Sequence, residues 1–456
     1  MIRSLPVFFC LFISLSLFAQ QEDTDRLSKE FHRGRRDALR ALMPQKSAAV
    51  LFSNSVRNRS NDVDFQFSQD PDFYYLTGYT ESDAALILFK EPRNFDGVMS
   101  DEILFVRDKN AKQEIWTGKT LGVNGAKEVL GFKSVYKGIE LKEFGINWSS
   151  LEEVFVIFPD QPNGTKAENA DLADLVSYFK EAVAATEVNL NNSGLHSMMS
   201  KLREIKSPEE LVLLQKAMDI TIEGFIEMMQ QLKPGMKEYE VQAIIEFHAK
   251  KNGAEYMGYP SICGSGPNAN ILHYTNNRRK GQGGDMMLVD MGAEYHGYTA
   301  DITRTIPVDG KFSEQERAIY SLVLAAQDSG ISMCRTGNSF KASHTAAMAV
   351  IAKGLKDLGI IKNENEASLY FMHGTSHYLG LDVHDAGTYA PLKPGVVMTV
   401  EPGIYIPEGS PCDRKWWNIG VRIEDDVLVT DGTPIIMTGA LPRSISDIEK
   451  LMADGD

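Results

Sequence analysis

The chain has 456 residues, which is too long for one ordinary hydrophobic core, so two domains are expected. Its formal net charge is −15, with 62 acidic against 47 basic residues. The sequence contains no run of basic residues and no motif typical of RNA or DNA binding, so we expect no nucleic-acid partner.

The first 19 residues differ in composition from the rest of the chain. Arg3 supplies a positive start, residues 7–18 are almost wholly apolar, and Ala19 precedes a polar run. This pattern is typical of a secretory signal peptide. Its apolar part is short for a bilayer span, which needs about 20 residues, although a retained membrane anchor is the alternative. We therefore expect an exported protein, periplasmic or extracellular, with no membrane attachment after cleavage.

The chain contains four cysteines, and Cys10 leaves with the predicted signal peptide. Cys263, Cys334 and Cys412 remain, and their spacing matches no zinc knuckle. At most one disulfide can form among three residues, and the sequence leaves open whether any of them pair.

The first half alternates short apolar runs with polar, helix-like stretches. The apolar runs are rich in β-branched or aromatic residues and are bounded by Asp, Asn, Pro or Lys, which is typical of strands; they cover residues 48–52, 84–89, 103–106 and 154–158. This alternation predicts an α/β domain over residues 25–190.

A polar, glycine-containing break at residues 191–194 precedes a strong helix start. Ser207 can cap that helix, Pro208 suits its first position, and Glu210 completes a capping box. Apolar residues then recur at helical spacing over 211–229. We place the domain boundary between 191 and 207.

The second domain, predicted over 200–445, contains a weak internal echo. One helix pair runs from Ser207 to Gly253, and a second opens at Ser313 and continues to Gly354. Each pair precedes a strand-rich stretch. The pairs are either ordinary αα-hairpins or the trace of an old duplication.

Two aspartates interrupt neighbouring strand-like segments. A hairpin whose turn is centred between Tyr295 and His296 places Asp290 directly opposite Asp301, with Cβ atoms ~4.5–5.5 Å apart on one face. Two negative charges at that distance repel each other, and a divalent cation compensates them directly.

Histidines gather in a second segment. His373, His377 and His384 fall within twelve residues, between glycines, and His273 lies in an apolar context further upstream. A lone histidine is usually structural or exposed, but a glycine-flanked group of three is more typical of metal ligands or proton-transfer groups.

Carboxylates also occur at two later strands. Glu401 follows a strand-like run before a Pro-Gly turn, which suits a side chain that faces a cavity. Arg422 and Glu424 alternate with Val421 and Ile423, so they are expected on one strand face and in one pocket.

Together these segments supply four carboxylates and one imidazole: Asp290, Asp301, His377, Glu401 and Glu424. Oxygen-rich ligation favours a harder divalent ion such as Mn²⁺ over a thiolate-type zinc site. Four carboxylates exceed the needs of one ion and suit two ions about 3.5–4 Å apart, as in hydrolytic two-metal sites.

At these residues the sequence resembles the pita-bread metallopeptidases, and among them the Xaa-Pro aminopeptidases (aminopeptidase P). The resemblance extends over nearly the whole mature chain, including residues 67–78, 114–118 and 377–385. It implies an α/β N-terminal domain with a mixed sheet, followed by an α+β pita-bread catalytic domain of the duplicated, creatinase/aminopeptidase-like type.

The resemblance implies two divalent metal ions, most simply Mn²⁺, with Zn²⁺ or Co²⁺ as alternatives. Asp301 and Glu424 would bridge both ions, Asp290 would complete one coordination shell, and His377 and Glu401 the other. It further implies that a hydroxide between the ions is the nucleophile and that Glu401 carries a proton to the leaving nitrogen.

The resemblance implies that His273 and His384 stabilise the tetrahedral intermediate and the scissile peptide. It places His373, Arg422 and Tyr405 in the substrate-binding pocket, on the product side. The substrates it implies are peptides with proline in second position, and the assembly it implies is a homo-oligomer, a dimer or tetramer.

Two other functions stay open from the sequence. A prolidase, which cleaves only Xaa-Pro dipeptides, would have the same metal ligands. A metal-free binding module of the same fold would have lost ligands, whereas none is missing here. The loop at residues 413–417, close to the expected site, leaves the accepted substrate length undecided.

Overall fold

The computed structural model describes residues 25–95, 97–159 and 170–455, so the predicted signal peptide lies outside the described residues. In the first part of the chain one six-stranded sheet has the order β6-β5-β4-β1-β7-β8. Its strands are β1 (Ser47–Phe52), β4 (Ala85–Phe95), β5 (Val98–Val106), β6 (Val135–Lys137), β7 (Glu153–Val156) and β8 (Asn189–Asn191).

The sheet is mixed, as expected. Strand β1 pairs antiparallel with β4 and parallel with β7, and β5 pairs parallel with β6. All four predicted strands are present, and β4 and β5 extend beyond the predicted apolar runs because they form one long antiparallel pair. The described residues of this part also form a two-stranded ribbon and six α-helices: β2 (Asn58–Ser60), β3 (Val63–Asp64), α1 (Lys29–Leu42), α2 (Pro71–Thr77), α3 (Ala111–Thr117), α4 (Gly122–Leu130), α5 (Leu172–Ala184) and α6 (Gly194–Arg203).

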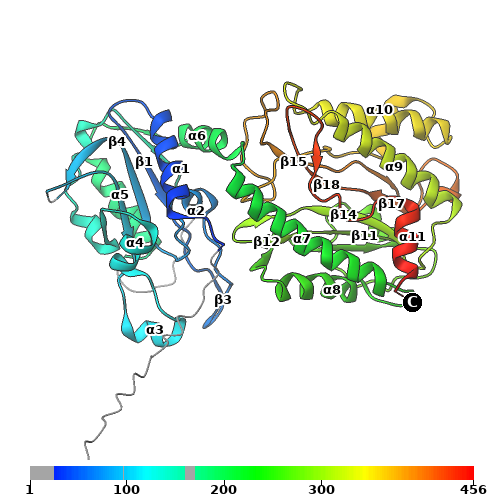
Figure 1. Ribbon diagram of the computed structural model, residues 1–456, viewed down its shortest axis with the longest axis horizontal. Helices are drawn as coiled ribbons and strands as arrows, with labels where there is room; N and C mark the ends of the chain where they lie inside the picture. The colour runs from blue at the N-terminus through cyan, green and yellow to red at the C-terminus, as the bar shows by residue number, and fades with distance from the viewer. Residues whose placement is uncertain (1–24, 96, 160–169, 456) are drawn as a thin grey trace, which may run out of the picture.

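The second part begins with the predicted capped helix. Ser207 and Glu210 form the capping box of α7, and Ser313 and Glu316 form that of α9, both as expected from the sequence. Its helices are α7 (Pro208–Gln231), α8 (Glu238–Lys251), α9 (Glu314–Ser332), α10 (Ala342–Asp357) and α11 (Ile445–Ala453). In Figure 1 the central strands lie between the α7–α8 pair and the α9–α10 pair.

The strands of this part form four small sheets, in the orders β10-β11-β14, β13-β12-β9, β15-β18-β19 and β16-β17. Their bounds are β9 (Tyr256–Met257), β10 (Ile262–Ser265), β11 (Met286–Met291), β12 (Ala293–Tyr295), β13 (Tyr298–Thr299), β14 (Ile302–Pro307), β15 (Val397–Val400), β16 (Gly403–Ile406), β17 (Ile419–Arg422), β18 (Asp425–Leu428) and β19 (Ile435–Ile436). Hydroxyl and backbone bonds between Thr305 and Arg422 tie β14 to β17, so the two aspartates and the later carboxylates lie side by side.

The two parts of the chain share a hydrophobic core. One buried cluster contains Tyr75 and Leu76 of α2, Leu214 of α7, Tyr298 of β13 and Leu381. Helix α6 occupies most of the segment in which the boundary was predicted, and the hydroxyl of Tyr75 donates to the carbonyl of Leu202 at its end. The two parts of the chain therefore meet in a packed interface and are not joined by an open linker.

The predicted register of the aspartate hairpin is wrong by two residues. Asp290 pairs with Thr303, and Tyr295 pairs with Tyr298, because the turn lies at His296 and Gly297. Both turn residues have positive φ, 51° and 87°, as the type I′ turn of a two-residue hairpin loop requires. A shift of two residues keeps every side chain on its face, so Asp301 lies diagonal to Asp290 on the expected side.

The described residues include three free cysteines, Cys263 and Cys334 buried and Cys412 partly exposed. Among the helices of the described chain, none combines the length and the apolar composition that a bilayer crossing requires.

A buried histidine in the first part of the chain makes the free energy of unfolding depend on pH. His32 of α1 is 3% exposed, its Nδ1 lies 3.0 Å from the carbonyl oxygen of Tyr75, and burial lowers its pKa to about 4. The unfolded chain therefore binds more protons than the folded one between that value and an unfolded pKa of about 6.5. Stability is retained above this window and is lost, by on the order of 3 kcal/mol, as the pH falls through it.

We expect His32→Gln to flatten this dependence. The difference in Tm between pH 7.5 and pH 5 should be smaller in the variant than in the parent protein, measured by calorimetry in one buffer series. An equal difference in both proteins would show that His32 does not contribute.

Candidate metal centre

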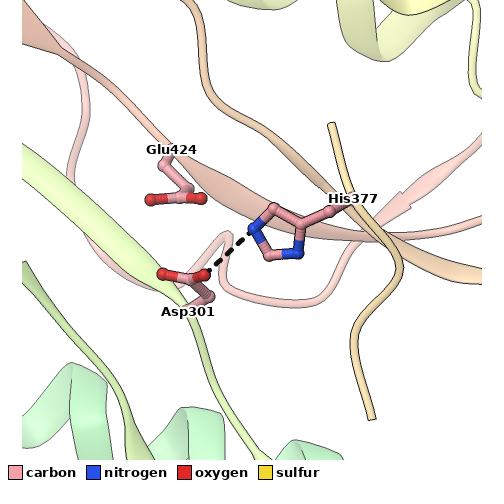
Figure 2. Close-up of side chains that lie close together, drawn as sticks. All are labelled: Asp301, His377 and Glu424. Atoms are coloured by element: carbon pink, nitrogen blue, oxygen red, sulfur yellow. Dashed lines mark ion pairs between the residues drawn. The ribbon is translucent and has the colours of Figure 1, made fainter. Parts of the chain in front are cut away.

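Three predicted ligands converge at the centre of the second part. Asp301 precedes β14, His377 lies in the loop before β15, and Glu424 lies between β17 and β18. Each offers one ligand atom, and these atoms lie within 4.8 Å of one another. Figure 2 shows the three side chains pointing toward a common point, with His377 and Asp301 paired at 3.3 Å.

Asp290 joins this group through a residue that the sequence did not single out. The hydroxyl oxygen of Tyr259 lies 2.7 Å from Asp290 Oδ1 and 2.6 Å from Asp301 Oδ1. A hydroxyl has one hydrogen, so it can donate to only one of the two carboxylates at a time. The carboxylate oxygen that does not receive this hydrogen needs a proton from elsewhere or a cation.

The imidazole of His377 is oriented for ligation. Its Nδ1 lies 3.0 Å from the carbonyl oxygen of Tyr378, to which an Nδ1–H can donate, and this leaves Nε2 facing the carboxylates. Nε2 is 3.3 Å from Asp301 and 3.5 Å from Glu401. Although burial opposes it, contact with Asp301 and the charge of Glu401 raise the pKa of His377 to about 9. The surroundings thus favour a positive charge at this position.

Glu401 lies next to His373 at the end of β15. Its Oε2 is 3.7 Å from His373 Nδ1, and burial raises the pKa of Glu401 to about 7. His373 belongs to a chain of bonds in which Arg422 Nη1 donates to the Tyr405 hydroxyl at 2.9 Å, and that hydroxyl contacts His373 Nε2 at 2.8 Å. Burial and the charge of Arg422 lower the pKa of His373 to about 4, so this histidine is neutral at pH 7.

Arg422 and Glu424 both bond to Thr303, although Glu424 lies in the break after β17 rather than on the strand where it was predicted. The Thr303 hydroxyl donates to Glu424 Oε2 at 2.6 Å and accepts from Arg422 Nε at 3.1 Å. Arg422 Nη2 also pairs with Asp290 Oδ2 at 2.5 Å. The guanidinium therefore reaches into the carboxylate cluster itself, beyond the substrate pocket in which the sequence placed it.

The buried charges of this cluster fit divalent cations. Burial, together with the charge of Asp301, raises the pKa of Glu424 well above its usual value, and burial also raises that of Asp290. One imidazole and one guanidinium face four clustered carboxylates, which leaves an excess of negative charge in a water-poor site. Oxygen-rich donors with excess negative charge are those that hard divalent ions prefer.

The remaining two histidines lie at the open side. His384 is exposed, and its ring lies edge-on to that of His377 with centroids 4.3 Å apart. His273 is also exposed, and its charge contributes to lowering the pKa of both His373 and His384, so it faces the same space. Neither contacts a carboxylate of the cluster, which suits substrate contact.

The loop that carries His273 is tied down by a buried carboxylate that the sequence did not reveal. Glu238, at the start of α8, accepts from the backbone N–H and hydroxyl of Ser265, both at 2.8 Å, and from the Tyr274 hydroxyl at 2.9 Å. The backbone of Arg279 also donates to it at 2.7 Å. No local pattern distinguishes Glu238 from other first-turn acidic residues, so only the fold identifies it.

A cleft of about 1,090 Å³ lies between the two parts of the chain and includes His384 in its wall. Asp70 and Asp72 of the first part line it opposite Glu255 and Glu294 of the second. His384, whose ring packs against that of His377, therefore links the carboxylate cluster to a space large enough for a peptide.

Comparison with known proteins agrees with this architecture. The sequence model of metallopeptidase family M24 matches residues 212–431, and that of the aminopeptidase P N-terminal domain matches residues 32–153. The chain is 38% identical to the Xaa-Pro aminopeptidase of Haemophilus influenzae, over 94% of this chain and 98% of that protein. It is 35% identical to the Escherichia coli Xaa-Pro aminopeptidase, over 93% and 97%.

Among solved structures, aminopeptidase P from Escherichia coli with the inhibitor Pro-Leu superposes with a TM-score of 0.85 at 34% identity, over 94% of this chain and 99% of that one. Both halves of the fold and the order of its elements are thus shared with these enzymes. The chain belongs to metallopeptidase family M24, in the group of Xaa-Pro aminopeptidases that carry an aminopeptidase P N-terminal domain.

Proposed function

We propose that the protein is a metallo-aminopeptidase that hydrolyses the bond between an N-terminal residue and a following proline. The observation that carries this proposal is the convergence of Asp301, His377 and Glu424 beside a peptide-sized cleft. The relatives described above support the aminopeptidase over a prolidase, because they carry the Xaa-Pro aminopeptidase name and match along nearly their whole length.

Two divalent ions are the proposed cofactors, and Asp290, Asp301, His377, Glu401 and Glu424 would hold them. When bound, such ions polarise a water molecule and the scissile carbonyl. Mn²⁺ is the proposed native metal because the donor set is rich in oxygen, with Zn²⁺ or Co²⁺ as alternatives.

The protein's own groups would act around that centre. His384 and His273 donate hydrogen bonds to the oxygen on which negative charge develops. Glu401 carries a proton to the departing proline nitrogen. The bonded chain of His373, Tyr405 and Arg422 orients the product side of the peptide.

Metal removal and substrate length test this function together. We expect cleavage of Xaa-Pro-Yaa tripeptides, little cleavage of Xaa-Pro dipeptides, loss of activity on exhaustive chelation, and recovery on adding Mn²⁺ or Co²⁺. Release of the N-terminal amino acid is measured by chromatography. Full activity in verified metal-free protein would refute the metal mechanism, and a preference for the dipeptide would identify a prolidase.

We further propose export, on the strength of the signal-like composition of residues 1–19. The mature protein should begin near Gln20 or Gln21, and mass spectrometry of protein from its native host measures this. Protein that retains Met1 and stays in the cytoplasm would contradict export.

A homo-oligomer, dimer or tetramer, is proposed for the assembly. The side chains of Ile115 and Trp116 on α3 support it, since they are 83% and 87% exposed, which is unusual for large apolar groups that remain in water.

A further inference from the structure

Arg203, the last residue of α6, joins the two parts of the chain through three carboxylates. Its Nη1 donates to Asp72 Oδ1 of α2 at 2.7 Å, and its Nη2 donates to Asp382 Oδ2 at 2.8 Å and also to Asp385. The Arg203 side chain is 5% exposed and that of Asp385 is 1% exposed. An arginine held in this way by three acceptors has little freedom to move.

The two aspartates from the second part flank His384 in sequence. Asp382 precedes the histidine by two residues and Asp385 follows it directly. The Arg203 guanidinium therefore forms ion pairs with the loop on both sides of His384. The second oxygen of Asp385 accepts from Lys206 Nζ at 2.7 Å. Both contacts arise from the segment that connects the two parts of the chain.

The loop itself is closed and closely packed against this pair. The backbone N–H of Asp385 donates to the Tyr378 carbonyl at 2.9 Å, and that of Gly380 donates to the Asp382 carbonyl at 3.1 Å. A Cβ on Gly380 would lie 2.1 Å from Asp385 Oδ2 and 2.9 Å from Lys206 Cε. The carboxylate of Asp385 can therefore pair with Arg203 and Lys206 in this position only because residue 380 lacks a side chain.

We propose that Arg203 is a positioning residue for His384, and that the N-terminal part of the chain takes part in catalysis through the bond from Asp72 to Arg203. This inference rests on the role of His384 given under the proposed function. His384 itself is exposed and its ring packs edge-on to that of His377, so the position of its ring depends on the backbone of its loop. Displacement of a catalytic group by about 1 Å can cost on the order of 10²-fold in rate.

Two substitutions at Arg203 and one at Asp72 test the proposal. Arg203→Met removes all three bonds, Arg203→Lys keeps the charge and can satisfy part of the set, and Asp72→Asn weakens only the bond from the N-terminal part. With Mn²⁺-loaded protein and a Xaa-Pro-Yaa tripeptide we expect kcat to fall about 30-fold, about 5-fold and about 3-fold respectively, as partial losses of the effect above. KM and metal stoichiometry should change less than twofold.

A double-mutant cycle with His384→Ala distinguishes positioning from a general loss of structure. Once the histidine is absent, Arg203→Lys should cost no further rate, since there is no ring left to position. Arg36→Lys is the matched control, because Arg36 is also buried and pairs with Glu102 in the N-terminal part, at 2.8 Å. Any effect of Arg36→Lys on kcat should be the same with and without His384.

Each outcome decides the matter. If Arg203→Lys slows the His384→Ala enzyme as much as it slows the parent, or if Arg203→Met leaves kcat unchanged, the positioning role is wrong. If His384→Ala is itself fully active, the role of His384 under the proposed function fails and the positioning role fails with it. The two failures are distinguishable, because His384→Ala stays slow if only the positioning role of Arg203 is wrong and is fully active if the role of His384 is wrong.

Discussion

His384→Ala should yield an enzyme that is loaded with metal but slow, with kcat lowered by on the order of 10²-fold or more, as for loss of a donor to a developing oxyanion. Its ring lies on the open side of the site and contacts no carboxylate of the cluster. His377→Ala should instead lose metal, because Nε2 of His377 faces Asp301 and Glu401 at 3.3 and 3.5 Å. The two histidines are seven residues apart in sequence, yet they should give opposite phenotypes.

The measurement is metal stoichiometry after gel filtration together with kcat at saturating Mn²⁺. Loss of metal from His384→Ala as severe as that from His377→Ala would show that the ligand has been assigned to the wrong histidine. Unchanged kcat in His384→Ala would remove it from the catalytic groups.

Gly292→Ala should disrupt the metal centre through the backbone. Gly292 lies opposite the strand that leads into Asp301, and a Cβ there would lie 1.7 Å from the carbonyl oxygen of Ala300. Because this neighbour is backbone, one strand of the hairpin must move, and with it either Asp290 or Asp301. We expect destabilisation of about 1–3 kcal/mol and loss of tight metal binding.

Gly283→Ala provides the matched control in the same domain. A Cβ at Gly283 meets only Asp309 Oδ2, at an ordinary contact distance of 3.6 Å. Its Tm and metal content should match those of the parent protein. A Gly292→Ala variant with parental Tm and metal affinity would show that the hairpin can absorb the collision, and that the separation of the two aspartates is not set there.

The sequence predicts those features that depend on local chemistry. The capping boxes at Ser207 and Ser313 mark helix starts to the residue, since hydroxyl and carboxylate satisfy the first N–H groups wherever a helix begins. The four apolar runs of the first half all form strands. Three of the five predicted donors, Asp301, His377 and Glu424, lie close enough together to hold one ion.

Features set by the exact position of a turn or by long-range contacts were not predicted. The hairpin register was wrong because the turn lies at His296 and Gly297, one position further along the chain than was assumed. Tyr259 and Thr303 were missed since an isolated hydroxyl carries no pattern that connects it to distant carboxylates. Arg203 was missed for the same reason: its partners are 131 to 182 residues away in sequence.

The core shared by α2, α7, β13 and residue 381 has a consequence for synthesis of the chain. Tyr74, Tyr75 and Leu76 are made more than 200 residues before Tyr298 and Leu381, which complete their packing. While the ribosome extends the chain, the nascent N-terminal part must therefore present an apolar face that nothing yet covers. The N-terminal part is therefore fully packed only once Leu381 has been made.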